Sequence, residues 1–313
     1  MRIASLVLFL IGLALPARAG DFPDKGDPAE ATRRTLATAD GPRDYLVQPL
    51  PGRGPRPVVI LLHGGTQEAR QIWKQTSLAT IARREGFILV APNGLDRHWN
   101  DGRGATIAAG PPSTADDIGF LLAVIDDVAR RDGGDPRTVF MAGVSNGGFM
   151  AMAFACSGRF QLKAGANLIS NLPAAAVGAC KAAPTPWLSL NGTSDSVIPF
   201  AGQPAGTVRR GEEQPALLSA DETFLFFAAR AGCARETLRD RLPDLDPGDG
   251  SWVERKTHPC PGARSAVQYI VHNGGHVTPG LALGPVLGRM LGGVNMDVDT
   301  GSLLWSFFGD QRR

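Results

Sequence analysis

The stretch Val139-Phe140-Met141-Ala142-Gly143-Val144-Ser145-Asn146-Gly147-Gly148 decides the fold of this 313-residue chain. Its apolar first half predicts a buried strand, and the small residues over 148–156 predict a helix immediately afterwards. Between them, Gly143-x-Ser145-x-Gly147 is the pattern of a tight turn that exposes a serine hydroxyl above a sheet. Glycine on both flanks lets strand and helix approach closely, so we expect a strained serine at the positive end of the helix. Ser145 is therefore the candidate nucleophile, and the alternative is a chance match in a chain with 39 glycines.

The rest of the chain repeats this alternation of strand and helix. Unbroken apolar runs predict buried strands at residues 58–62, 87–91, 164–169, 187–190 and 266–271. Helices are predicted over residues 72–85, 114–131, 219–231 and 303–308, the second and third opening with capping-box patterns. Residues 44–47 alternate and predict an edge strand, and residues 242–251 predict a surface loop. The pattern predicts an α/β fold with a mostly parallel, doubly wound sheet and helices on both faces.

The N-terminus predicts an export signal. Arg2 is followed by an apolar run over 6–15 and then by Ala17-Arg18-Ala19, the arrangement of a signal peptide that is cut before Gly20. An uncleaved membrane anchor is the alternative, but the run is short for a bilayer. We therefore expect a signal peptide over 1–19, a loose N-terminal lead-in over 20–40 and one catalytic domain over 41–313, in a secreted or periplasmic protein.

The expected mature chain is close to neutral. The whole chain has 32 Lys and Arg against 30 Asp and Glu, and residues 1–19 contain two arginines and no acid, which leaves 30 of each. This balance argues against a nucleic-acid or anionic-lipid partner. No apolar run after residue 19 is long enough to span a membrane.

Four cysteines follow the signal sequence: Cys156, Cys180, Cys233 and Cys260. An even count in an exported chain predicts two disulfides, and buried free thiols are the alternative. Of the three possible pairings, chain order favours Cys156–Cys180 and Cys233–Cys260, each worth about 3 kcal/mol on the chain-entropy estimate. No Cys-x-x-Cys or Cys/His cluster occurs in the sequence, so we expect no metal site.

Candidate catalytic groups follow the predicted strands. Ser145 is followed along the chain by Asp195, after one buried strand, and by His276, after the last one, which is the order of an α/β-hydrolase triad. Because the carboxyl ends of parallel strands meet at one edge, we expect these side chains together. His276 lies on a Gly-Gly turn and is the favoured base, with Asp195 orienting it. The alternatives are His272, at the end of the strand, as the base, and a turn-forming role for Asp195.

An oxyanion hole is expected beside the serine. One donor is the N–H of Asn146, the residue after the nucleophile. The other is an N–H from the loop that begins at His63, after an apolar strand, and either Gly65 or Thr66 supplies it.

Two further residues have both a functional and a structural interpretation. Trp99, in the long loop over 92–112, is either a substrate-binding wall of the pocket or a core aromatic that holds the loop. Asp117 is favoured as a helix cap over a catalytic acid because of its capping-box position.

The chain resembles a family of secreted esterases that groups polyhydroxybutyrate depolymerase (LpqC-like) and feruloyl esterase proteins. The similar segments, which lie between about residues 45 and 308, are Leu62-His63-Gly64, Trp99-Asn100-Asp101, Asp116-Asp117-Ile118-Gly119-Phe120, Gly143-Val144-Ser145-Asn146-Gly147-Gly148, Asn191-Gly192-Thr193-Ser194-Asp195 and Gly274-Gly275-His276-x-x-Pro279-Gly280. The resemblance implies the α/β-hydrolase fold, a Ser145–His276–Asp195 triad and hydrolysis of an ester through an acyl-enzyme. It implies little about the substrate.

The chain departs from this family at two positions. The family usually has Trp before Pro279, where this chain has Thr278, and its oxyanion loop often has Cys where this chain has Gly65. The resemblance places both positions near the acyl pocket, so the family's substrates do not transfer directly to this chain.

The sequence thus predicts an exported serine esterase whose substrate is a small-molecule or oligomeric ester. His276 would accept the serine proton, the oxyanion hole would stabilise the tetrahedral intermediate, and the chemistry requires no cofactor or metal. A serine peptidase or lipase on the same fold is one alternative. A non-catalytic, hydrolase-like binding protein is another, and the intact Ser/Asp/His set argues against it.

Overall fold

The computed structural model describes residues 22–312 except 53, 105–112, 210, 236–237 and 263. The expected signal peptide over 1–19 lies outside the described residues, and so does part of the long loop over 92–112. Among the described residues, no helix has the length and apolar character that a membrane crossing needs.

Ten strands of the described chain form one sheet, in the order β1-β2-β4-β3-β5-β6-β7-β12-β11-β10. They are β1 (Thr32–Thr38), β2 (Gly41–Val47), β3 (Arg56–Leu62), β4 (Ile88–Pro92), β5 (Gly134–Val144), β6 (Ala164–Leu168), β7 (Trp187–Gly192), β10 (Leu238–Arg241), β11 (Trp252–Cys260) and β12 (Arg264–His272). The six central strands, from β4 to β12 in this order, are parallel, and two antiparallel strands extend the sheet at each side. β8 (Val208–Arg209) and β9 (Glu212–Glu213) form a separate small pair. The predicted mostly parallel sheet is confirmed.

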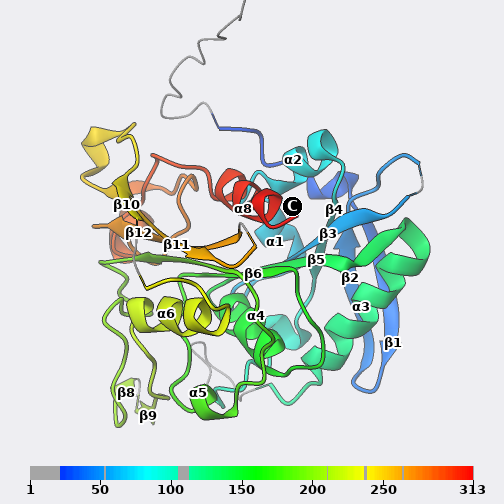
Figure 1. The fold of residues 1–313 in the computed structure, drawn as a ribbon, viewed down its shortest axis with the longest axis horizontal. Coiled ribbons are helices and arrows are strands. Elements are labelled where there is room, and N and C mark those ends of the chain that lie inside the picture. Colours follow the sequence, from blue (N-terminus) through cyan, green and yellow to red (C-terminus); the bar gives the residue numbers. More distant parts are fainter. Residues whose placement is uncertain are drawn as a thin grey trace, which may run out of the picture.

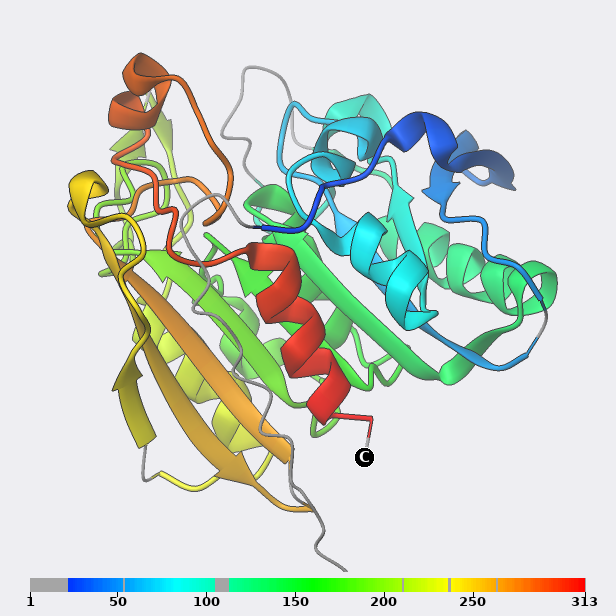
Figure 2. The same ribbon diagram turned by 90° about the horizontal axis from the view of Figure 1, so that it is seen from above.

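Helices cover both faces of this sheet (Figure 1). α1 (Ala69–Trp73), α2 (Leu78–Glu85) and α8 (Thr300–Asp310) lie on one face, where α2 and α8 are side by side (Figure 2). α3 (Asp117–Asp132), α4 (Asn146–Cys156) and α6 (Ala220–Arg230) lie on the other face. The remaining helical segments are short: η1 (Pro28–Glu30), η2 (Leu95–Arg97), α5 (Ala176–Ala179), η3 (Pro247–Asp249) and α7 (Pro285–Met290).

The unbroken apolar runs arise because each central strand packs on both faces. In β3, Val59 and Leu61 belong to the apolar cluster with α1, α2 and α8, whereas Ile60 belongs to the cluster with α3 and α4. Stacked aromatic rings join helix to sheet, as between Phe140 and Phe308, whose ring centroids are 4.7 Å apart. The rigid centre of the sheet therefore fixes where each strand ends, and with it the loops that carry the candidate site.

Three local expectations are wrong. The expected loose lead-in over 20–40 contains β1, which pairs with β2 along its whole length, so the strand over residues 44–47 is not at the edge. The helix expected over 72–85 is divided into α1 and α2 by residues 74–77. Asp116, not Asp117, caps α3, since its carboxylate accepts a hydrogen bond from Gly119 N–H. Asp117 is instead buried and pairs with Arg43 at 2.5 Å.

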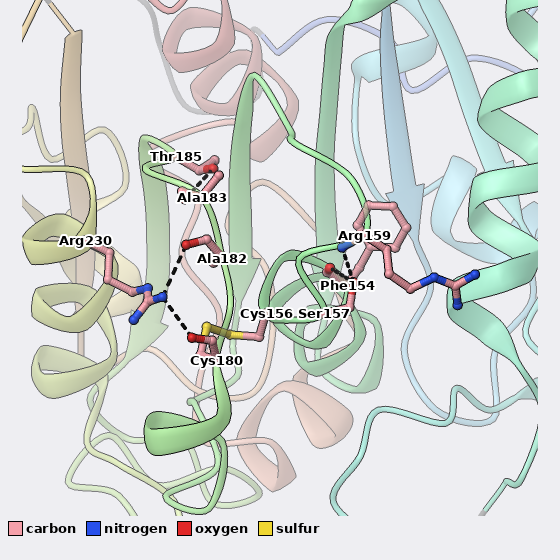
Figure 3. The surroundings of a disulfide bond; sticks show 9 residues. All are labelled: Phe154, Cys156, Ser157, Arg159, Cys180, Ala182, Ala183, Thr185 and Arg230. Carbon is pink, nitrogen blue, oxygen red and sulfur yellow. Dashed lines mark hydrogen bonds between the residues drawn. A yellow bond between two sulfur atoms is a disulfide. The ribbon is translucent and has the colours of Figure 1, made fainter.

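Both predicted disulfide pairs are present, Cys156–Cys180 and Cys233–Cys260. The first ties the end of α4 to the segment after α5 (Figure 3). Arg230 of α6 reinforces this link by donating to the carbonyls of Cys180 at 2.8 Å and Ala182 at 3.2 Å (Figure 3). The α4 helix, which follows the candidate nucleophile, is thus anchored at its far end, and the two disulfides fit an extracellular protein.

Candidate active site

Ser145 lies on a tight turn between β5 and α4. Its backbone has φ 53° and ψ −118°, a strained conformation for a residue with a side chain, as expected from the sequence. The flanking glycines are required by close approach. A Cβ on Gly143 would lie 2.0 Å from the carbonyl oxygen of Gly147, and one on Gly147 would lie 2.5 Å from that of His63. The Ser145 N–H donates to Leu168 of β6 at 2.9 Å, which ties the strained turn to the sheet.

The structure brings Ser145, His276 and Asp195 together from three different strand ends. His276 Nε2 is 3.0 Å from Ser145 Oγ, and His276 Nδ1 is 2.7 Å from Asp195 Oδ2. A carboxylate can only accept, so Nδ1 carries the proton and Nε2 presents a lone pair to the serine hydroxyl. The other oxygen of Asp195 accepts from Val197 and Ile198 N–H, both at 2.8 Å, and its side chain is 1% exposed. The arrangement can accept a proton from the serine hydroxyl and stabilise the imidazolium that forms.

His272, the alternative base, is occupied elsewhere. Its Nε2 is 3.0 Å from Glu254 of β11, and its ring stacks on Trp252 with centroids 3.7 Å apart. The side chain is therefore held on the outer strands and does not contact Ser145, in keeping with a packing role.

The loop after β3 is organised by the buried His63. Burial lowers the pKa of His63 to about 4, so its ring is neutral near pH 7. Its Nε2 accepts from Gly94 N–H at 2.9 Å, which leaves Nδ1 protonated and donating to Gly64 O at 2.7 Å. The Gly64 carbonyl also accepts from Gln67 N–H. In a trans peptide the N–H points away from the preceding carbonyl, so the Gly65 N–H points away from the His63 ring.

The two candidate donors of this loop differ in availability. The Thr66 N–H donates to Arg97 O at 2.9 Å, whereas the Gly65 N–H has no acceptor within the described chain. A Cβ on Gly65 would lie 3.7 Å from Asn146 Cβ, so these two backbone segments are neighbours. Asn146 is the first residue of α4, where a helical N–H has no partner within the helix. Gly65 and Asn146 are therefore neighbouring residues whose N–H groups have no acceptor within the described chain.

Of the two interpretations of Trp99, the structural one fits its surroundings. Its side chain is 3% exposed and belongs to the cluster with α3 and α4, so it does not form the expected substrate-binding wall. The indole Nε1 donates to His63 O at 2.9 Å, and the backbone N–H donates to the side chain of Asn146 at 2.8 Å. The indole thus anchors the segment around Trp99 against the loop after β3.

The sequence did not indicate a buried ion pair, Asp101 with Arg103, that lies two residues after Trp99 in the same loop. Asp101 accepts from Arg103 Nε at 2.9 Å and Nη2 at 2.6 Å, and also from Asn146 Nδ2 at 2.6 Å. The Arg103 guanidinium lies 3.7 Å above the ring of Phe149 in α4. Asp101 stands in the segment that carried the family resemblance, but nothing in the sequence connected it to the residue after the nucleophile.

A doubly wound parallel sheet with Ser145, Asp195 and His276 at its strand ends defines the α/β-hydrolase class. No protein-family model matches the chain. The "Putative esterase NocK" of Nocardia uniformis subsp. tsuyamanensis is 31% identical over 263 residues, which cover 80% of this chain and 75% of that protein. The chain belongs to the α/β-hydrolase esterase family that includes this protein.

More distant relatives agree with this assignment. A "Probable feruloyl esterase C" of Aspergillus flavus is 28% identical over 199 residues, or 63% of this chain and 59% of that protein. A "Poly(3-hydroxybutyrate) depolymerase" of Ralstonia pickettii is 29% identical over 122 residues, or 35% of this chain and 24% of that protein. This chain thus spans less than two thirds of the length of these two relatives. The resemblance to this group of esterases is confirmed.

A solved structure supports the fold. The structure titled "Acetyl xylan esterase from Aspergillus awamori" superposes with a TM-score of 0.54 at 12% identity, covering 89% of this chain and 99% of that one. At this identity the likeness concerns the fold alone.

Proposed function

We propose that this protein is a serine hydrolase of carboxylic esters that uses Ser145 as nucleophile, His276 as general base and acid, and Asp195 as the orienting carboxylate. The observation that carries the proposal is the continuous relay from Asp195 Oδ2 through both nitrogens of His276 to Ser145 Oγ, with separations of 2.7 and 3.0 Å. Both separations lie within the reach needed for proton transfer. The membership of an esterase family is an independent support.

In this proposal the serine oxygen attacks the ester carbonyl while its proton passes to His276 Nε2. The carbonyl oxygen becomes an oxyanion, which the N–H groups of Gly65 and Asn146 stabilise at the positive end of α4. Collapse of this intermediate expels the alcohol, which takes the proton from His276, and leaves an acyl-serine. Water then repeats the sequence, giving up a proton to His276 and releasing the acid.

The relatives support a proposal for the substrate class. Feruloyl esterases and a poly(3-hydroxybutyrate) depolymerase are among them, so we propose soluble aryl esters of the feruloyl type or oligomers of hydroxyalkanoates. We also propose that residues 1–19 are removed on export and that the protein works outside the cytoplasm, where both of its disulfides persist.

The test compares the wild type with Ser145→Ala on p-nitrophenyl esters, methyl ferulate, hydroxybutyrate oligomers and a peptide anilide. We expect ester hydrolysis by the wild type and a loss in turnover of about 10⁶ in the variant, as in a well-studied triad enzyme. Circular dichroism checks that the variant is folded. Full activity in a folded variant would eliminate Ser145 as nucleophile, and preferential cleavage of the anilide would identify a peptidase.

A further inference from the structure

The side chain of Asn146 is hydrogen-bonded to Trp99 and Asp101, in the loop that follows β4. Its Oδ1 accepts from Trp99 N–H at 2.8 Å. Its Nδ2 donates to Asp101 Oδ2 at 2.6 Å and to Trp99 O at 3.3 Å. The residue is 4% exposed, so these bonds are shielded from water. Asn146 therefore combines a backbone N–H that is a proposed oxyanion donor with a side chain that is hydrogen-bonded to Trp99 and Asp101.

The same loop is also hydrogen-bonded to the loop after β3, which carries Gly65. The indole of Trp99 donates to His63 O at 2.9 Å, and the rings of Trp99 and His63 are 4.9 Å apart. Two residues earlier, Arg97 O accepts from Thr66 N–H at 2.9 Å. Residues 97–101 thus connect the loop that carries Gly65 to the residue that follows the nucleophile.

We infer that Asn146 is a positioning residue whose side chain fixes the spacing between the two oxyanion donors, an inference that rests on the proposed function. Hydrogen-bond donors stabilise an oxyanion only where they are held in place before the charge develops. Gly65 and Asn146 come from different strand ends. The hydrogen bonds through Trp99 link the two segments that carry these N–H groups into one frame. Without the amide, α4 and the loop that carries Gly65 lose this connection.

The anchor at the far end of this frame is rigid. The side chains of Asp101 and Arg103 are 3% and 5% exposed, and they pair at 2.6 Å. Arg103 also covers the ring of Phe149 on the first turn of α4. Position 146 needs a group that donates to the Asp101 carboxylate and accepts from the Trp99 N–H, and an amide does both. A carboxylate at 146 would instead face the Asp101 carboxylate.

A second buried asparagine provides the matched control. Asn295, 3% exposed, donates from Nδ2 to Ser251 Oγ and to Asp297 Oδ2, both at 2.7 Å. Like Asn146, it is an amide that bonds a buried aspartate, but its partners lie in the loops next to β11 and α8. Asn295→Asp creates the same kind of carboxylate pair without touching either oxyanion donor.

The experiment compares Asn146→Asp with Asn295→Asp on a p-nitrophenyl ester, with active sites counted by burst titration. For Asn146→Asp we expect a fall in kcat of about 10²-fold with KM changed by less than about threefold, because a donor displaced by about 1 Å loses transition-state stabilisation. Binding of a trifluoromethyl ketone, which forms an oxyanion adduct, should weaken in parallel with kcat. Asn295→Asp should lose thermal stability while kcat stays within about twofold of the wild type.

An unchanged kcat in folded Asn146→Asp overturns the inference. If Asn146→Asp does not fold, Asn146→Ser must show the same split between kcat and KM. A wild type without esterase activity defeats the proposed function, whereas an active wild type, an inactive Ser145→Ala and a fully active Asn146→Asp defeat only this inference.

Discussion

The loops at the carboxyl ends of the central strands (the carboxyl edge) and those at their amino ends (the amino edge) differ in which residues adopt strained backbone conformations. Six non-glycine residues in the described chain have a positive φ, namely Thr66, Asp96, Arg97, Ser145, Ile169 and Asn273. All six lie within five residues of the carboxyl end of β3, β4, β5, β6 or β12. At the amino edge, the left-handed positions that precede β4, β5 and β12 are occupied by Gly86, Gly133 and Gly262.

Glycine is the residue that adopts a left-handed conformation without strain, so the turns at the amino edge are not strained. At the carboxyl edge side chains are retained at a cost of about 1 to 2 kcal/mol each. Ser145 carries the hydroxyl of the candidate site, and Thr66 lies in the loop that presents the Gly65 N–H. Strain is therefore concentrated where strand ends must aim particular groups, and this concentration marks the candidate site independently of any motif.

The largest expected effect separates two histidines that lie four residues apart, one beyond the end of β12 and one within the strand. His276 lies on the loop beyond β12, whereas His272 is fixed at the end of the strand by Glu254 and Trp252. His276→Ala should lower turnover by about 10⁶-fold because the serine loses its base, as in a triad enzyme without its histidine. His272→Ala should act through stability, by about 1 kcal/mol.

Acylation bursts on both variants, with folding checked by circular dichroism, decide between these histidines. If folded His276→Ala acylates at the wild-type rate and His272→Ala does not, the assignment of the base is wrong. The role of Asp195 would then fall as well, because its carboxylate bonds His276.

The neutral, buried His63 at the start of the loop after β3 predicts a second, smaller effect, which is on the pH dependence of the unfolding free energy. Burial lowers its pKa to about 4 from an ordinary value of 6.5, so between these values the unfolded chain binds more protons than the folded one. Stability from this group is thus complete above about pH 6.5 and is lost as the pH falls to about 4. The difference corresponds to about 3 kcal/mol of unfolding free energy.

Urea unfolding at several pH values measures this loss. His63→Gln, whose amide oxygen can still accept from Gly94 N–H, should show a smaller fall in unfolding free energy across the same pH window. An unchanged pH dependence in this variant would show that other groups are responsible for the acid sensitivity.

Much of the architecture could be predicted because it follows from local periodicity. Strands buried on both faces read as unbroken apolar runs, and Gly143-x-Ser145-x-Gly147 indicated the strained turn that the structure contains. The capping box at Ser219 and Glu222 is also present, because it depends on residues only three positions apart. These predictions were confirmed because no distant contact competes with the local signal.

The errors occur where long-range contacts decide the structure. β1 has few apolar residues, and it becomes a strand because β2 offers a free edge to pair with. Asp117 was expected to cap its helix, but Arg43, 74 positions away, draws its carboxylate inward and leaves the cap to Asp116. The hydrogen bonds between Asn146 and Trp99 join residues 47 positions apart, and no local sequence pattern predicts them. The sequence indicated the residues of the candidate site, but not the contacts that hold them in place.

The smallest expected effects come from two substitutions that place a glycine at the carboxyl edge and remove one from the amino edge. Thr66 is exposed with φ 63°, so Thr66→Gly relieves strain without removing a buried side chain and should raise the unfolding free energy by about 1 kcal/mol. Gly86 is the mirror case, because its φ is 76° and a Cβ added there would have no other atom within 4 Å. Gly86→Ala should therefore lower stability by about 1 kcal/mol through backbone strain alone. Urea unfolding and ester turnover are measured for both variants.

Activity should not follow stability in this pair. Thr66→Gly gives the loop that carries Gly65 more freedom, so turnover should fall by about twofold to fivefold although the protein is more stable. Gly86→Ala lies at the amino edge and should leave turnover per folded molecule unchanged. If Thr66→Gly gains stability with no loss of turnover, the strain at this position has no bearing on the site. If it loses stability, Thr66 is held by contacts that outweigh its backbone strain, and the contrast between the two edges fails at this residue.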